Sequence, residues 1–522
     1  MRGGLATHAV TVGSMTLVSR ILGFVRDMVL ARYFGAGLGM DAFFVAFKIP
    51  NFMRRLFAEG AFSLAFIPVL SEYRAQRDVV AVRALVDRVA GTLAGILLVV
   101  SILGILASPV LVMLFAPGFL GDAEKFELAA RMLRITFPYI LFISLAAFAG
   151  GILNTYGRFA APAFAPVLLN LALIGASVLA APHLERPEMA LAIAVFVGGI
   201  LQLVCLLPGL ARLRLLPRFR WGWRDSGVRR ILKLMGPAIF GSSVAQINLL
   251  FDTLIASFLA TGSVSWLYYS ERLVEFPLGV FGIALSTAIL PSLARSHARG
   301  SRESFARTLD QGLRWVLVLG VPAALGLFLL AGPVLATLFQ YQQFGAHDTQ
   351  MAAGSLMAYA AGLPAFILVK VLVPAFYSRQ DTVTPVRIAV VAMLANMVLN
   401  AVFVLSMLHW KIAGPHAGLA LATSVSAYLN AGLLYWRLHR SQLYAPGAGW
   451  RAMLVRVLLA TFLLGVLLGA GTGDLGDWLP MRGSTRAMHL AAWIAAGAVL
   501  YLGVLRLLGE PLVGLGYGTA KE

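Results

Sequence analysis

Charged side chains inside long apolar segments are the feature of this sequence with the most chemical potential. The densest set lies in two early segments and comprises Arg20, Arg26, Asp27, Arg32, Asp41, Lys48, Arg54, Arg55 and Glu59. Later apolar segments add Glu271, Arg272, Glu275 and Lys370. Because an ionised group at the centre of a bilayer costs roughly 2.5–3.5 kcal/mol, such charges are expected to line a hydrated cavity.

Arginine is the commonest of these charges, and its chemistry favours an anion. Four arginines, namely Arg20, Arg26, Arg54 and Arg272, outnumber the acids around them. A planar guanidinium binds phosphate through two parallel hydrogen bonds. We therefore predict a diphosphate-binding set of these four, supported by Asp41, Glu59, Asp27, Glu271 and Lys370. The alternative is that the charges snorkel or form structural pairs, and it stays open for Arg32 and Asp41. Ser19, Asn51, Gln246 and Tyr268 are further polar candidates, with helix packing as the alternative role.

A second group of polar residues suits a small cation. Asp252 lies in an otherwise apolar segment, Asn396 and Asn400 share a helix face at i, i+4, and Thr423 adds a hydroxyl. One carboxylate with several neutral oxygens fits a hard monovalent ion, so we predict a sodium site here. The alternative is that Asp252 is protonated or bonded to a neighbouring helix while the asparagines pack.

Motifs of the common enzymes are missing from the sequence. It contains no G-x-x-x-x-G-K-[ST] phosphate loop and no H-E-x-x-H, and its eight histidines are scattered. We expect a transporter rather than an enzyme, without a cofactor other than the sodium ion. Its energy would then come from an ion gradient, the membrane potential or the substrate gradient.

The composition requires a membrane. Of 522 residues, 60% are hydrophobic and only 12% are charged, about half the roughly 25% of soluble domains. A soluble enzyme, a disordered scaffold and a disulfide-rich secreted domain are excluded. The net charge of +19 lies mainly in short loops, where it sets topology instead of binding nucleic acid.

The apolar segments predict an all-α polytopic protein of about fourteen transmembrane helices. The expected ranges are 8–34, 40–72, 84–115, 127–153, 160–181, 189–211, 231–260, 266–294, 312–338, 352–377, 384–407, 415–437, 451–471 and 487–508. Basic residues concentrate in alternate loops, above all in 211–233, whereas the other loops hold only Lys125, Arg186, Lys411, Arg482 and Arg486. This asymmetry places both termini in the cytoplasm. Pro50, Gly60 and Pro68 are expected to bend or break the second helix.

An internal repeat divides the chain. Residues 27–37 resemble 252–262, residues 62–68 resemble 285–291, and residues 156–158 resemble 377–379. A repeat of six helices gives two lobes of the same orientation, a transporter architecture with its substrate between the lobes. We expect an N-lobe at 1–215, a cytoplasmic amphipathic linker at 216–230, a C-lobe at 231–440, and two extra helices at 441–522. We expect the lobes to rock, with the links 33–41 and 260–268 closing the outer side.

Specific motifs connect this pattern with a known family. SRILGFVRD at 19–27, DAFFVAFKIPN at 41–51, RRLFAEGAF at 54–62, GSVSWLYY at 262–269 with ERL at 271–273, and FYSRQD at 376–381 resemble the MurJ (MviN) lipid II flippase family of the MOP exporter superfamily. The resemblance runs from about residue 10 to the last helix.

The resemblance implies a flippase of the bacterial inner membrane. Such a protein moves lipid II, an undecaprenyl-diphosphate disaccharide-pentapeptide, from the inner to the outer leaflet for peptidoglycan synthesis and hence cell shape. The family's essential cavity residues correspond to Arg20, Arg26, Asp41, Arg54 and Arg272. The extra C-terminal helices would border a groove for the lipid tail. The expected partners are lipid II, membrane lipids and other cell-wall synthesis proteins, with the chain itself a monomer.

Two other functions fit parts of the pattern. A flippase for another undecaprenyl-diphosphate-linked glycan would use the same phosphate chemistry. A drug or cation antiporter of the MOP superfamily would share the twelve-helix core, but it should show unpaired acids in the cavity instead of a basic excess.

Overall fold

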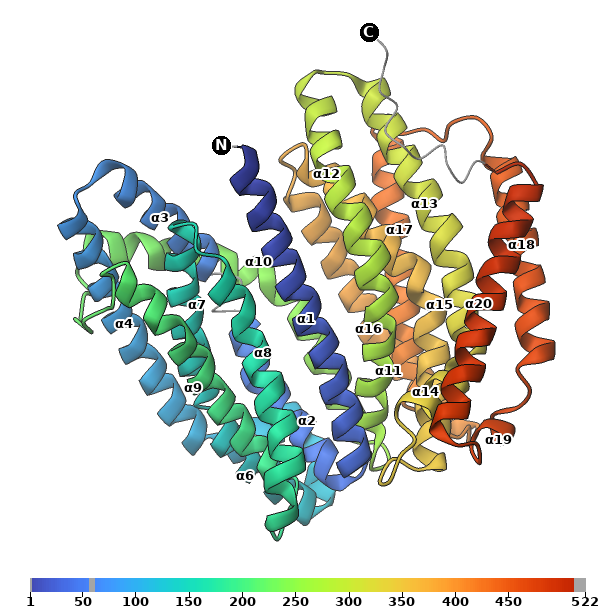
Figure 1. The fold of residues 1–522 in the computed structure, drawn as a ribbon, viewed down its shortest axis with the longest axis horizontal. Helices are drawn as coiled ribbons and strands as arrows, with labels where there is room; N and C mark the ends of the chain where they lie inside the picture. The colour runs from blue at the N-terminus through green and yellow to red at the C-terminus, as the bar shows by residue number, and fades with distance from the viewer. Residues whose placement is uncertain (1, 56–61, 511–522) are drawn as a thin grey trace. The chain divides into compact units, whose positions relative to one another are not determined.

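The structure is a computed structural model that describes residues 2–55 and 62–510. Those residues are helices joined by short links, without a β-strand among them (Figure 1). They divide into two compact units, residues 1–265 with 341–344 and residues 266–340 with 345–522. Each unit is described below by itself.

Unit 1 contains the first ten helices. Their bounds are α1 Arg2–Phe34, α2 Leu38–Arg54, α3 Ser63–Gln76, α4 Val79–Leu106, α5 Ser108–Phe115, α6 Ala123–Thr136, α7 Tyr139–Thr155, α8 Ala160–Gly175, α9 Met189–Arg212 and α10 Ser226–Ala256. A π-helical turn, Ala176–Ala180, continues α8. Aspartates cap several N-termini: Asp78 accepts from Ala81 N at 2.8 Å, and Asp225 accepts from Gly227 N at 2.9 Å.

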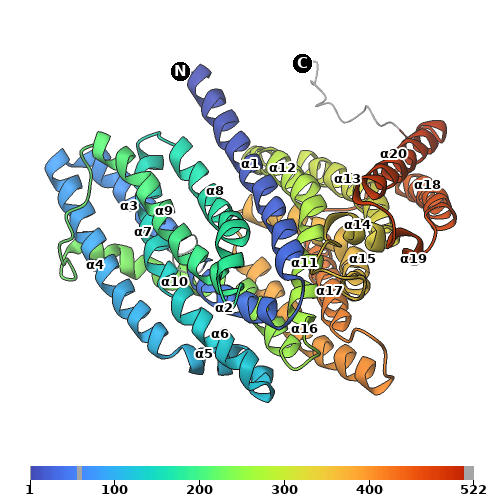
Figure 2. The same ribbon diagram turned by 60° about the horizontal axis from the view of Figure 1, so that its bottom comes forward.

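Aromatic side chains fill the core of unit 1. Phe66 lies 5.1 Å from both Phe62 and Phe148, measured between ring centroids, and aliphatic residues of α4 and α7 belong to the same core. Figure 2 shows α4, α7 and α9 packed beside one another. Helix α10 packs against α3 and α4, and this contact places it in unit 1.

Unit 2 contains most of α11 Ser263–Pro277 and all later helices. These are α12 Ile283–Ala298, α13 Arg302–Leu329, α14 Ala331–Leu338, α15 Ala346–Tyr377, α16 Val383–His409, α17 Ala417–Arg440, α18 Trp450–Gly471, α19 Leu475–Trp478 and α20 Gly483–Leu507. A π-helical turn, Leu278–Gly282, follows Pro277 and joins α11 to α12. Helices α15, α16 and α17 form the densest packing, and α18 and α20 lie side by side (Figures 1 and 2).

A knot of hydrogen bonds ties the link 441–449 to α13. One oxygen of Asp310 accepts from Tyr444 Oη and Trp450 Nε1, each at 2.7 Å, and the other accepts from Arg314 Nε at 2.7 Å. Arg314 also donates to the carbonyl of Ala448 at 2.6 Å. Burial and the hydrogen bond to Asp310 raise the pKa of Tyr444, so its phenol stays protonated and donates. This Asp310 knot fixes the start of α18 on α13.

The predicted all-α membrane fold is confirmed. Eleven of the helical segments within the described residues are long and apolar enough to span a membrane. The expected ranges outside these eleven are 8–34, 40–72 and 231–260, and the first two hold the dense charges discussed above. Helix α2 ends at Arg54 and α3 begins at Ser63, and Gly60 lies outside the described residues.

Compact units and sequence repeats divide the chain at different places. The units separate after Ser265, whereas the repeat separates before residue 231. The unit boundary reflects which helices pack together, and α10 packs on α3 and α4. The repeat boundary rests on sequence similarity between the two halves. The expected lobes therefore stay a prediction. The linker 216–230 is helical only from Ser226.

Candidate functional site

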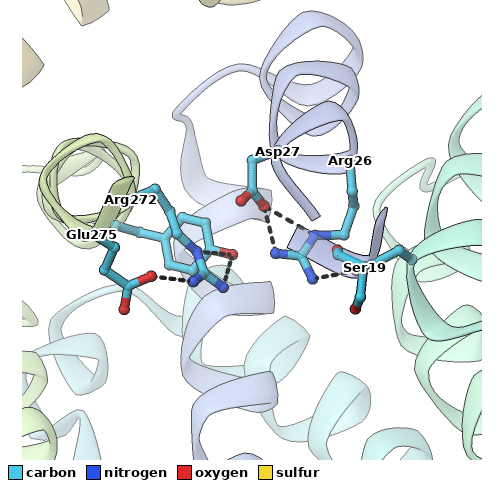
Figure 3. A network of polar contacts seen from close by, with 7 residues as sticks. Ser19, Arg26, Asp27, Arg272 and Glu275 are labelled. Carbon is cyan, nitrogen blue, oxygen red and sulfur yellow. Dashed lines mark hydrogen bonds and ion pairs between the residues drawn. The ribbon is translucent and has the colours of Figure 1, made fainter. Parts of the chain in front are cut away.

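Arg26 and Asp27 form a buried ion pair on α1. Arg26 Nε and Nη2 donate to Asp27 Oδ1 at 3.0 and 2.7 Å. Only 6% of Arg26 and 1% of Asp27 are exposed. Because both nitrogens reach one oxygen, the guanidinium is held on one edge while Nη1 points elsewhere (Figure 3). A buried charge is stable in this environment only when it is paired and hydrogen-bonded.

Asn170 on α8 completes this network, and the sequence interpretation missed it. Its Oδ1 accepts from Arg26 Nη1 at 3.0 Å, and its Nδ2 donates to the carbonyl of Ser19 at 3.2 Å. The residue is 94% buried, since only 6% of it is exposed. A lone asparagine in the apolar stretch 160–175 was a usable signal, because an amide there requires a partner.

The other candidates of unit 1 have different surroundings. Arg20 is exposed on α1, where it can reach an aqueous ligand. Arg54 Nε donates to Asn51 Oδ1 at 2.9 Å at the end of α2, which makes Asn51 a positioning group for this arginine. Glu59 lies outside the described residues, as does the side chain of Gln246.

Asp41 contacts a lysine and a helix N-terminus instead of the four arginines. Its Oδ2 accepts from Lys125 Nζ and from Gly262 N, each at 2.8 Å. Its Oδ1 accepts from Ser265 N at 3.0 Å and Ser265 Oγ at 2.7 Å. Gly262 directly precedes α11 and Ser265 lies in its first turn, where free N–H groups favour an anion.

This Asp41 network satisfies its charges. Asp41 is 0% and Lys125 4% exposed, and Lys125 Nζ also lies 4.4 Å from the centroid of Phe119. Four donors occupy the carboxylate, close to the number that two oxygens accept. The network joins α2 and α6 to residues 262–265. Asp41 ends the expected outer link 33–41 and residues 262–265 belong to the other, 260–268, so the network connects the two links. Sequence interpretation placed Lys125 in a loop and missed this pairing.

In unit 2, Arg272 is held on its own helix. Its Nη1 donates to Glu275 Oε2 at 2.5 Å, while Nε and Nη2 donate to Tyr268 Oη at 3.3 and 3.4 Å (Figure 3). The guanidinium carbon lies 5.3 Å from the centroid of the Tyr268 ring. The side chain stays about one-third exposed, so it remains accessible to a ligand. Glu271 is partly buried on the same helix, and Lys370 is exposed on α15.

The predicted sodium ligands are divided between the units. Asp252 lies on α10 in unit 1, and Lys48 Nζ donates to its neighbour Thr253 Oγ1 at 2.9 Å. Asn396 and Asn400 are buried on α16 in unit 2, and Ser426 Oγ donates to Asn396 Oδ1 at 3.4 Å. Thr423 Oγ1 on α17 is buried and lacks a hydrogen-bond partner among the described residues. Within those residues, no cluster of three His, Cys, Asp or Glu could hold a metal ion.

Relatives of known name resemble the chain over nearly its whole length. The family described as lipid II flippase MurJ matches residues 30–482. The probable lipid II flippase MurJ of Vibrio cholerae is 48% identical over 522 residues, covering 99% of this chain and 98% of the relative. The lipid II flippase MurJ of Burkholderia cenocepacia is 44% identical over 505 residues, covering 96% of each.

Solved structures agree with this relationship. A lipid II flippase MurJ in an inward closed conformation matches with a TM-score of 0.80 at 26% identity, covering 95% of this chain and 98% of that one. An inward-facing MATE family multidrug resistance transporter of the MOP superfamily shares the fold, with a TM-score of 0.66 at 14% identity over 83% of this chain and 98% of that one. With the family match spanning most of the sequence, the chain belongs to the lipid II flippase MurJ family.

Proposed function

We propose that this chain moves lipid II from the inner to the outer leaflet of the bacterial inner membrane, where it is a multi-pass protein. The observation that carries the proposal is the full-length match to relatives named lipid II flippases. The transported lipid would supply peptidoglycan synthesis and so maintain cell shape. The chain acts as a monomeric secondary-type transporter, in contact with membrane lipids and other cell-wall synthesis proteins.

The diphosphate of the substrate is bound by Arg20, Arg26, Arg54 and Arg272. Arg26 supports this role best, because Asp27 and Asn170 fix its position. A guanidinium fixed in this way binds a diphosphate with little loss of side-chain entropy. Glu59, Glu271 and Lys370 complete the supporting set, and Asp41 supports the site indirectly, by joining α2 to the start of α11.

Fourteen transmembrane helices with both termini in the cytoplasm carry this site. Residues 1–215 and 231–440 act as lobes of parallel orientation, the linker 216–230 lies at the cytoplasmic surface, and residues 441–522 provide the groove for the lipid tail. The eleven apolar spans support this arrangement, and the predicted span 40–72 is divided between α2 and α3.

Transport proceeds by alternating access, driven by the membrane potential or an ion gradient. The Asp41 network supports the role of the links 33–41 and 260–268 in closing the outer side, because Asp41 binds Gly262 and Ser265 directly. Opening that side would break the three hydrogen bonds that Gly262 and Ser265 donate to Asp41.

A reversible crosslink tests this gate. Gly37 and Ala260 are exposed, and the space around Gly37 admits a Cβ. In a Cys205→Ser background, which removes the natural cysteine, the Gly37→Cys, Ala260→Cys protein joined by a cleavable bismaleimide should stop transporting lipid II in proteoliposomes and recover when the linker is cut. Either single-cysteine protein in that background, treated in the same way, should keep its activity. Undiminished transport by the joined protein would contradict the rocking mechanism.

The arginine assignment is tested in cells depleted of their own flippase. Arg26→Ala and Arg272→Ala should reach the membrane yet fail to prevent lysis, and lysine should rescue poorly because it lacks the planar fork. The control is Arg158→Ala, which removes an exposed arginine from the link between α7 and α8. Full complementation by both Arg26→Ala and Arg272→Ala would refute the assignment.

The alternative substrates are separated by the same depletion experiment. Accumulation of lipid II in the inner leaflet supports the proposed function. Accumulation of a different undecaprenyl-diphosphate-linked glycan, with normal peptidoglycan, would assign the chain to that lipid. A drug or cation antiporter would leave both lipids unchanged.

A further inference from the structure

The connection between α9 and α10 is a built segment fastened to α4. Residues 213–225, here called the strap, form no helix. Arg218 N donates to Asp87 Oδ1 at 2.8 Å and Arg220 N donates to the Asp87 carbonyl at 3.2 Å. Gly222 N donates to Thr92 Oγ1 at 3.0 Å. Both α4 acceptors are buried, so the path of the strap along α4 is fixed.

Two glycines of α4 allow the strap to lie this close. A Cβ added at Gly91 would stand 2.3 Å from the carbonyl oxygen of Arg220, and one added at Gly95 would stand 2.7 Å from the ring of Trp221. The backbone of the strap therefore rests directly on the backbone of α4. The Trp221 ring lies over Gly95, and the arginine side chains of the strap are exposed.

The exposed side chains of the strap form a basic and aromatic surface. Arg218, Arg220 and Arg224 are exposed. Trp221 and Trp223 stack with ring centroids 6.4 Å apart and an interplanar angle of 12°, and they are 66% and 49% exposed. The acid of the strap, Asp225, is already paired with Arg88. Exposed arginines beside exposed tryptophans are typical of the boundary between a bilayer and water.

An apolar cavity of about 410 Å³ lies next to the strap within unit 1. Its walls include Leu93, Ile96 and Val100 of α4, and Val228 and Ile231 of α10, the helix that the strap enters. Thr92 lines the cavity and also accepts the hydrogen bond from the strap. The strap thus lies beside a cavity suited to a hydrocarbon chain.

We propose that the strap and this cavity bind one anionic phospholipid. Arg218, Arg220 and Arg224 contact its phosphate group, the tryptophans flank its glycerol region, and one acyl chain enters the cavity. Charge favours this occupant: the arginines are unpaired among the described residues, and an anionic headgroup gains about 1 kcal/mol per nearby basic residue. An acidic protein segment would match the arginines but would leave the cavity without a hydrocarbon chain.

Lipid binding to the delipidated full-length protein tests the proposal. In detergent micelles, native mass spectrometry should show one tightly bound phosphatidylglycerol and much weaker binding of phosphatidylcholine. The Arg218→Ala, Arg220→Ala, Arg224→Ala variant should bind phosphatidylglycerol about 100-fold more weakly, roughly fivefold per arginine. The matched control removes the same charge from another basic loop through Arg295→Ala, Arg299→Ala and Arg302→Ala. It should bind as the original chain does.

A second variant examines the cavity apart from the charges. Ile96→Trp, or Val100→Phe if the first fails to fold, fills the cavity and should abolish tight phosphatidylglycerol binding while the arginines stay in place. Equal losses in the two arginine variants would overturn the site, because they would indicate general attraction to basic loops. Unchanged binding by a folded cavity variant would also overturn it, as would preferential binding of undecaprenyl phosphate over phosphatidylglycerol.

Discussion

Asn170 holds Arg26 from the side opposite to Asp27. The amide accepts from Arg26 Nη1 at 3.0 Å and donates to the Ser19 carbonyl at 3.2 Å, so one side chain of α8 binds two turns of α1. Gly23 lies between those turns, and a Cβ there would stand 3.6 Å from Asn170 Nδ2. The amide therefore rests on α1 itself, and the direction of the guanidinium depends on it.

Loss of this amide should lower transport more than it lowers stability. Asn170→Ala removes one hydrogen bond to a charged group, and we expect about 1.5–3 kcal/mol less stability of unit 1. Arg26 would then rotate about Asp27, so complementation should fail even where the protein is abundant. Asn170→Asp keeps the acceptor and should retain more activity than alanine.

Asn154→Ala provides the control, since Asn154 lies at the end of α7 and its side chain is not part of this network. Flippase-depleted cells and melting curves of the purified variants supply the two readouts. If Asn170→Ala complements as well as Asn154→Ala does, Asn170 only packs the helices.

The Asp41–Lys125 pair should respond unequally to single and double replacement. Lys125→Met leaves a buried carboxylate with one donor fewer, and Asp41→Asn leaves a buried ammonium. Removal of one partner from a buried pair typically costs about 3–5 kcal/mol. The double variant should recover part of that loss, because neither buried charge remains.

Thermal melting of the purified proteins measures this coupling. Arg131→Met offers a control on the same helix, because Arg131 pairs with Glu127 in an exposed position, and exposed pairs contribute about 0–1 kcal/mol. Strictly additive effects of the two core replacements would show that Asp41 and Lys125 do not stabilise each other.

The sequence predicts the hydrophobic segments and the charged residues within them. It does not predict which residues of other helices those charges bind. The helical segments follow from runs of apolar residues, and α4 and α9 begin within five residues of their predicted starts, which were 84 and 189. The arginines Arg26 and Arg54 were found because charge in an apolar run is conspicuous. Periodicity contains no information about which distant helix supplies a partner, so Asn170 and Lys125 were missed.

Other differences have local physical causes. The strap carries many arginines and two tryptophans, a composition that also fits an amphipathic helix. Its extended path results from long-range hydrogen bonds to Asp87 and Thr92 on α4. Such bonds form between residues more than a hundred positions apart, so local sequence preference cannot predict them.

The Asp310 knot should control how firmly α18 is attached to α13. Asp310→Ala removes the acceptor of Tyr444, Trp450 and Arg314 together, and we expect about 2–4 kcal/mol lower stability from buried donors left without a partner. Limited trypsin digestion should then cut faster after Arg440 and Arg451, the two trypsin sites that flank the link 441–449.

Asp381 supplies a matched acid for this comparison. It lies in the link between α15 and α16, where it accepts from Thr384 N at 3.0 Å, and it is far from α18 in the chain. Asp381→Ala should leave cleavage of the link 441–449 unchanged. Equal protection of that link in Asp310→Ala and the original chain would show that packing alone holds α18.

The coupling ion provides the last prediction. Asp252 has a carboxylate on α10, whereas the buried Asn396, Asn400 and Thr423 contribute neutral oxygens on α16 and α17. If these groups bind sodium when the protein is in one state of its cycle, sodium stabilises that state by mass action. The melting temperature should therefore rise with sodium concentration at fixed ionic strength. A sodium concentration of about 100 times the dissociation constant should raise the free energy of unfolding by about 2.7 kcal/mol. Asp252→Asn should abolish this rise, while Glu303→Gln, which neutralises an exposed acid paired with Arg307, should preserve it. Potassium or choline that stabilises the original chain as strongly as sodium would refute the site. A sodium effect that persists in Asp252→Asn would place the ion elsewhere.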